Sequence, residues 1–206
     1  MKIVVPVKEV AVLDEEFDLL EDRPGVDPDA IEWELNEWDD FSLEEALQLR
    51  EAEGEGEVVV VSVGDEEAEE GLRACLAKGA DRALRIWDDA LEGADPLTVA
   101  RVLAAVVERE SPDLVLCGVQ SSDAVQGATG VALAAHLGLP RVAVVKGLDY
   151  DAAHRAARSR DVYMPNARPS RRQRQVCSVA ASATKTSSRS RVAGRNVCRT
   201  GARSGT

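Results

Sequence analysis

Five short runs rich in apolar residues recur along the first 145 positions of the chain. They occupy residues 2–7, 58–63, 84–87, 113–117 and 141–145, and Val is their commonest residue. Within the better runs the apolar residues are nearly continuous, rather than alternating with polar ones. That pattern is typical of strands buried on both faces of a parallel sheet, so we expect five such strands.

Helical patterns lie between these runs. Ser42 and Glu45 match the capping-box sequence, so we expect a helix to begin just after Ser42. Gly79 is a natural C-terminal cap for the second helix, and Pro96 suits the first turn of the third. The expected helices span residues 44–52, 66–78, 96–109 and 129–137.

Strands that alternate with helices predict an α/β fold with a doubly wound, mostly parallel, Rossmann-like sheet of about five strands. Residues 11–35 interrupt this alternation with an acidic insertion that is partly a hairpin. Trp33 lies within this insertion, and Trp38 lies just after it. They either attach the insertion to the core or wall a pocket for a planar ring whose edge Asn36 would contact. The spacing alone favours packing.

Charge divides the chain into two parts near Tyr150. Residues 1–150 contain 12 basic and 35 acidic residues, whereas residues 151–206 contain 13 basic and only 2 acidic ones. The second part also lacks Leu, Ile, Phe and Trp, so it has little apolar surface to bury. We therefore predict a nucleotide-binding α/β domain over residues 1–150. Residues 151–206 form a low-complexity basic tail that is disordered or translated out of frame.

Several classes of protein are not expected. No apolar run is long enough to span a membrane, and Lys8 follows the first apolar residues too soon for a secretory leader. We therefore expect a cytoplasmic protein. The four cysteines contain no Cys-x-x-Cys pair and there are only two histidines, so a metal site is not expected. Cys75 and Cys117 lie in apolar patterns typical of reduced core thiols.

The loop after the fourth strand is the best candidate for ligand binding. Ligands of open α/β sheets bind beyond the carboxyl ends of the strands, which here are Pro6, Val63 and the loop 118–130. Small residues in that loop let backbone N–H groups approach a phosphate, and Thr129 opens the following helix. The loop is neither a Walker loop nor a GxGxxG motif, so taken alone an ordinary strand-to-helix turn is the favoured interpretation.

The sequence offers no recognisable set of catalytic residues. His136 lies in an apolar helical pattern and has no evident Ser or Cys partner. The carboxylates are too numerous for one pair to stand out as a general acid and base. We therefore expect no catalytic residue and no metal ligand in this chain.

Several segments, in order along the chain, resemble the beta subunit of electron-transfer flavoproteins. They are residues 1–10 (MKIVVPVKEV), 36–47 (NEWDDFSLEEAL), 60–64 (VVSVG), 77–83 (AKGADRA) and 112–118 (PDLVLCG), followed by the loop that ends at Thr129-Gly130. The resemblance covers about the first 150 residues. It implies an adenine-nucleotide-binding subunit that carries AMP or a second FAD. It also implies a heterodimer with a larger alpha subunit that holds the redox-active FAD, which the two subunits share.

Such a heterodimer carries electrons from dehydrogenases to a quinone-linked oxidoreductase of the respiratory chain, and the flavin performs the chemistry. The resemblance assigns nucleotide contacts to Pro6, Asn36, Glu37, Trp38, Asp39, Val63, Gly118, Val119, Gln120, Ser121, Ser122, Asp123, Ala124, Val125, Gln126, Gly127, Ala128, Thr129 and Gly130. Glu37-Trp38 replaces the family's Pro-Phe. Fewer polar side chains stand before Thr129, which leaves the choice between AMP and FAD open.

Two alternatives stay open. The first is a stand-alone adenine-nucleotide-binding protein of the same sheet type, acting as a sensor, a stress-type protein or a small ATP-using enzyme. A Lys or Arg in the phosphate loop would favour it, and residues 118–130 contain neither. A nucleic-acid-binding tail is disfavoured because Tyr163 is its only aromatic residue. A frameshift between codons 151 and 161 would explain the tail. The acidity of residues 1–150 resembles that of proteins from salt-loving microbes.

Overall fold

The computed structural model describes residues 1–13, 20, 24, 26–27, 31–151, 156–162 and 175–179. Among these residues, seven strands form the main sheet, in the order β5-β4-β1-β6-β9-β7-β8. All neighbours are parallel except β7 and β8. The strands are β1 (Lys2–Pro6), β4 (Glu57–Val63), β5 (Arg82–Ile86), β6 (Leu114–Gly118), β7 (Arg141–Asp151), β8 (Ala156–Val162) and β9 (Gln175–Val179).

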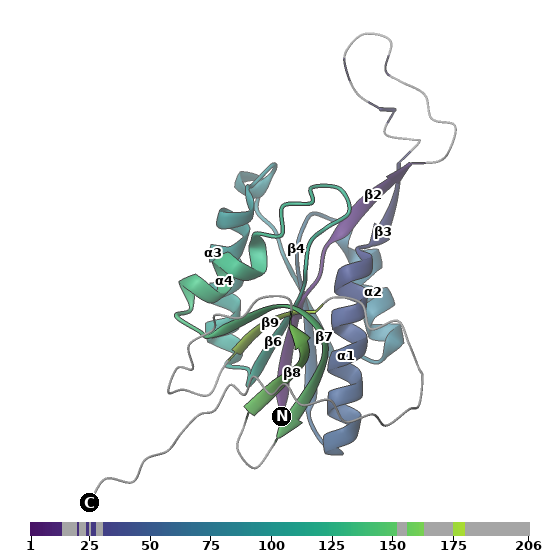
Figure 1. The fold of residues 1–206 in the computed structure, drawn as a ribbon. Coiled ribbons are helices and arrows are strands. Elements are labelled where there is room, and N and C mark those ends of the chain that lie inside the picture. The colour runs from purple at the N-terminus through teal and green to yellow at the C-terminus, as the bar shows by residue number, and fades with distance from the viewer. Residues whose placement is uncertain are drawn as a thin grey trace, which may run out of the picture.

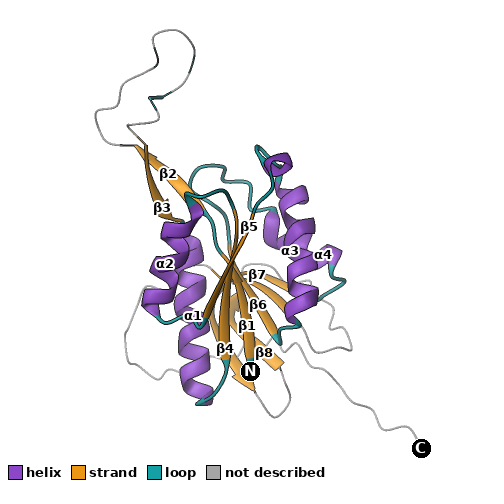
Figure 2. Cartoon of the chain, turned by 180° about the vertical axis from the view of Figure 1, so that it is seen from behind, coloured by secondary structure: helices purple, strands orange, loops and turns teal. Residues whose placement is uncertain are grey.

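In the described part of the chain, four helices cover the two faces of this sheet. They are α1 (Glu37–Glu53), α2 (Ala68–Lys78), α3 (Pro96–Glu110) and α4 (Thr129–His136). The first two lie on one face and the last two on the other, as Figures 1 and 2 show. The structure therefore confirms the predicted doubly wound, mostly parallel α/β fold. Each of the five predicted strands is present, and the sheet gains β8 and β9 from beyond residue 151.

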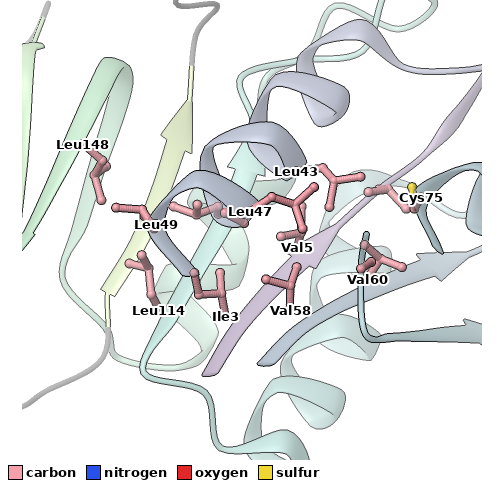
Figure 3. Packing of buried hydrophobic residues seen from close by; sticks show 14 of the residues in the cluster. Ile3, Val5, Leu43, Leu47, Leu49, Val58, Val60, Cys75, Leu114 and Leu148 are labelled. Carbon is pink, nitrogen blue, oxygen red and sulfur yellow. The ribbon is translucent and has the colours of Figure 1, made fainter. Parts of the chain in front are cut away.

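Successive residues of the central strands enter different layers of the core. Ile3 and Val5 point toward α1 and α2, whereas Val4 points toward α3 and α4, and all three are fully buried. Figure 3 shows the first of these layers, where Leu43 and Leu47 of α1 lie beside strand residues. The nearly continuous Val runs of β1 and β4 are explained by this burial on both faces.

Helix α1 begins earlier than the sequence predicts. Its N-cap is Asn36, and its first turn carries Glu37, Asp39 and Asp40, whose charges are favourable at the positive end of a helix. The capping-box prediction at Ser42 is wrong, because the Ser42 hydroxyl lies within the helix and donates to the carbonyl of Trp38 at 3.0 Å. The other three helices begin or end within two residues of their predicted bounds.

The acidic insertion contains the expected hairpin. Strands β2 (Glu9–Leu13) and β3 (Ile31–Leu35) pair antiparallel and project from the sheet on the side away from the N-terminus (Figure 1). The favoured packing of the two tryptophans is wrong for Trp33, whose surface is 43 % exposed on β3. Trp38 packs edge to face on Phe41 with ring centroids 6.4 Å apart. Most residues between the two strands lie outside the described residues.

The predicted tail contributes two strands to the described structure. β9 lies between β6 and β7, and β8 forms the edge beside β7. The rest of residues 152–206 lies outside the described residues. Its predicted disorder and frameshift therefore remain predictions.

The core layer beneath α1 gives a first stability prediction. Leu43→Ala should lower the free energy of unfolding by about 2–5 kcal/mol, because Leu43 is fully buried in this core cluster and its truncation leaves a cavity there. Leu97→Ala is the matched control, since Leu97 is also helical but 59 % exposed, and it should cost about 0.5 kcal/mol or less. Urea unfolding of the full chain measures both values. Equal losses for the two variants would contradict this description of the core.

Candidate functional site

Three strand ends meet at one edge of the sheet and border a cleft of about 690 Å³. Pro6 ends β1, Val63 ends β4 and Gly118 ends β6, and all three residues line the cleft. A cleft of this size is ordinary for small-molecule sites. Its position beyond the carboxyl ends of parallel strands is the one expected for ligands of open α/β folds.

Most of the residues that the sequence predicts for nucleotide contact line this cleft. They are Pro6, Asn36, Asp39, Val63, Gly118, Val119, Gln120, Ser121, Ala124, Gln126, Gly127, Ala128, Thr129 and Gly130. Glu37, Trp38, Ser122, Asp123 and Val125 are not among the lining residues. Their role as contacts therefore stays a prediction without support from the cleft.

Asn36 joins the start of α1 to the loop 118–130. Its side-chain amide donates to the Gln120 carbonyl at 2.9 Å, and its Oδ1 accepts from the Ser122 N–H at 3.3 Å. The backbone N–H of Asn36 donates to the carbonyl of Lys8 at 2.9 Å. Because Asn36 is 1 % exposed, these bonds have little competition from water.

Asp39 forms a second set of contacts beneath the same loop. Its carboxylate accepts from the Lys8 N–H at 3.0 Å, from the Gly118 N–H at 3.1 Å and from the Asn36 amide at 3.0 Å. Burial raises the pKa of the Asp39 carboxyl to about 7, against the opposing effect of these three hydrogen bonds. The Asp39 side chain thus forms hydrogen bonds to residues at the ends of β1 and β6 and at the start of α1.

Gly118 has a steric reason to be glycine. A Cβ at this position would lie 2.2 Å from Asp39 Oδ1 and 3.0 Å from the Asp39 backbone nitrogen. Any larger residue would push the start of α1 away from the end of β6. The close approach of these two segments therefore depends on Gly118 as much as on Asp39.

The loop 118–130 leads into α4 through backbone conformations that are uncommon for side-chain-bearing residues. Gly127 has φ +57°, in the left-handed region that glycine adopts without strain, whereas Val125 has φ +53°. Thr129 begins α4 and lines the cleft, so the N-terminus of that helix, with its unpaired N–H groups, lies at the cleft's edge. Such donors suit a phosphate or another anionic group.

The structure adds a wall that the sequence analysis missed. Trp87 follows β5, residues 91–96 connect it to α3, and Val99 and Leu103 come from that helix. Lys8, Val7, Asp65 and Cys117 also line the cleft without having been predicted. The predicted strand at 84–87 ends at the same edge of the sheet as the other strands. The position of that strand end could therefore have predicted that the residues after it line the cleft.

The arrangement combines apolar walls with polar donors on one side, which fits a ring system that carries a phosphate. The N–H groups near Gly127 and Thr129 would meet the phosphate, while Val63, Val99 and Leu103 offer apolar contact to a ring or ribose. No group of three His, Cys, Asp or Glu side chains is arranged to hold a metal in the part of the chain that the structure describes. Across that same part, every helix is too short or too polar to cross a membrane.

The model of the electron transfer flavoprotein domain matches residues 25–198. The chain belongs to the electron transfer flavoprotein family. The family match continues past Tyr150 into the segment predicted to be out of frame or disordered. The resemblance read from the sequence motifs is thereby confirmed at the level of the family.

Several electron transfer flavoprotein beta subunits are similar to this chain. The subunit from Methylophilus methylotrophus is 53 % identical over 151 residues, which cover 73 % of this chain and 57 % of that protein. The subunit from Bradyrhizobium diazoefficiens is 37 % identical over 151 residues, covering 73 % and 60 %. The mitochondrial subunit from Oryza sativa subsp. indica is 38 % identical over 143 residues, covering 68 % and 56 %. The aligned part of this chain thus spans less than two thirds of each relative.

In this family member, the buried Asp39 should give stability a pH dependence. The folded carboxyl keeps its proton up to about pH 7, whereas the unfolded chain releases it near the ordinary value of 3.8. The folded state therefore binds more protons between these values, and Asp39's contribution to stability is lost as pH rises through about 7. Relative to Asp39→Asn, the wild-type chain should lose up to about 1.4 kcal/mol per pH unit across this window.

Urea unfolding of both proteins at a series of pH values from 4 to 8 measures this difference. The substitution also changes hydrogen bonds, but that cost shifts the two curves by a constant and leaves their relative slope unchanged. Parallel curves across the whole range would show that Asp39 titrates alike in the folded and unfolded chains.

Proposed function

We propose that this chain is an electron-transfer flavoprotein beta subunit that binds AMP or FAD in the cleft at the carboxyl edge of the sheet. The observation that carries the proposal is the coincidence of two independent results. The nucleotide contacts implied by the family resemblance gather mostly around one cleft, and the geometry of an open α/β sheet selects that same edge.

The chemistry of the cleft supports a nucleotide. Backbone N–H groups at Gly127 and at the start of α4 are suited to a phosphate. The chain's own residues would bind and orient the nucleotide. A bound FAD would supply the electron-carrying chemistry, so the subunit needs no catalytic residue.

The proposed partner is a larger alpha subunit that holds the redox-active FAD shared between the two chains. The heterodimer would act in the cytoplasm and carry electrons from dehydrogenases to a quinone-linked oxidoreductase. Full-length chain co-expressed with such a subunit should co-purify with it and with its flavin. If the chain retains nucleotide but never associates with a flavin-bearing subunit, the stand-alone nucleotide-binding alternative replaces this proposal.

Nucleotide retention provides the direct test of the cleft. Chain purified without added nucleotide and then denatured should release AMP or FAD at close to one molecule per chain, measured by chromatography of the supernatant. Gly127→Val should weaken affinity for that nucleotide about tenfold or more, because a side chain there obstructs backbone contacts to the phosphate.

Gly138→Val is the matched control for this variant. Gly138 has φ +60°, so valine meets the same backbone strain, but Gly138 does not line the cleft. It should therefore lose stability without losing nucleotide. Equal retention in the two variants would remove the loop 118–130 from the site.

A further inference from the structure

The charges around the cleft are unfavourable for an anionic ligand. Its lining residues include the carboxylates of Asp65, Glu92 and Asp95. Among the described residues that line it, Lys8 is the only one with a cationic side chain. A phosphate that enters this acidic surrounding therefore depends strongly on where the Lys8 ammonium lies.

The backbone of Lys8 is held on both sides. Its N–H donates to Asp39 Oδ2 at 3.0 Å, and its carbonyl accepts from the Asn36 N–H at 2.9 Å. These bonds keep the residue at the carboxyl end of β1, directly beside the cleft. A change confined to the Lys8 side chain leaves both of them intact.

The side chain of Lys8 reaches the phosphate-binding loop. Its ammonium forms an ion pair with Asp123, a loop residue that does not itself line the cleft. The Lys8 side chain is 48 % exposed, so the ion pair does not bury it. Although burial acts to raise the pKa of Asp123, the hydrogen bond from Lys8 and further hydrogen bonds leave it below its ordinary value.

We infer that Lys8 is the cation that binds the phosphate of the nucleotide, and that Asp123 holds its ammonium at the loop and competes with the phosphate for it. This inference rests on the proposed nucleotide site. The loop 118–130 contains no Lys or Arg, and the inference assigns the positive charge for the phosphate to Lys8, which lies 115 positions from Asp123 in the sequence. Discrimination between a nucleotide and an uncharged nucleoside would then depend on Lys8.

Binding of AMP and of adenosine to the full-length, dialysed chain, measured by isothermal titration calorimetry, tests the inference. Lys8→Met should weaken AMP binding about tenfold, as expected for one charge-assisted hydrogen bond, and should leave adenosine binding unchanged. Retained adenosine binding also shows that the variant is folded. Asp123→Asn should strengthen AMP binding severalfold, and it should have no such effect when Lys8→Met is also present.

Lys78→Met is the matched control, because Lys78 also forms an exposed ion pair, with Asp40, but does not line the cleft. It changes the net charge equally and should leave AMP binding within about twofold of wild type. If Lys8→Met and Lys78→Met affect AMP binding alike, or if Lys8→Met weakens adenosine and AMP equally, the inference is wrong. If the wild-type chain binds neither AMP nor FAD, the proposed function itself fails, and the assignment of Lys8 fails with it.

Discussion

The buried carboxylate of Asp39 is the contact on which the geometry of the cleft depends. Removing a carboxylate from water is costly unless hydrogen bonds replace the lost solvation. Here two backbone N–H groups and one side-chain amide provide that replacement, and they come from the ends of β1 and β6 and from the start of α1. Burial of Asp39 therefore requires that these three segments meet correctly, and all three border the cleft.

Secondary structure was predictable where short-range pattern decides it. The Val runs of β1 and β4 are buried on both faces, so their composition alone identified them as strands. The start of α1 was not predictable by the same reasoning. Asn36 is a good N-cap residue, but its side chain makes no capping bond and contacts Asp39 and Gln120 instead. A local capping rule therefore favoured Ser42. It could not identify Asn36, because the hydrogen bond from the Asn36 amide to the Gln120 carbonyl joins residues 84 positions apart.

The site was predictable to the extent that it follows from sheet geometry. Pro6, Val63 and Gly118 end parallel strands, so their meeting at one edge required only the strand assignments. The end of β5 lies at the same edge of the sheet, so the same strand-end rule also predicts the wall from Trp87 to Leu103. Lys8 differs, because its proposed role depends on the direction of a flexible side chain. Its ion pair with Asp123 spans 115 positions, and no spacing in the sequence indicates it.

The acidic residues around the cleft and the Lys8–Asp123 ion pair together limit which anions the cleft can bind. A free lysine beside the loop would attract any small anion, since the phosphate-binding donors of an α/β loop have little selectivity of their own. Pairing with Asp123 neutralises the ammonium, while Asp65 and Glu92 keep the surrounding cleft negative. An anion must then compete with Asp123 for the ammonium, which reduces its electrostatic gain on binding. A ligand must also bury apolar area against residues such as Val99 and Leu103, which an inorganic ion cannot do. If the cleft binds a nucleotide as proposed, the carboxylates and the apolar walls together would favour that nucleotide over its phosphate alone.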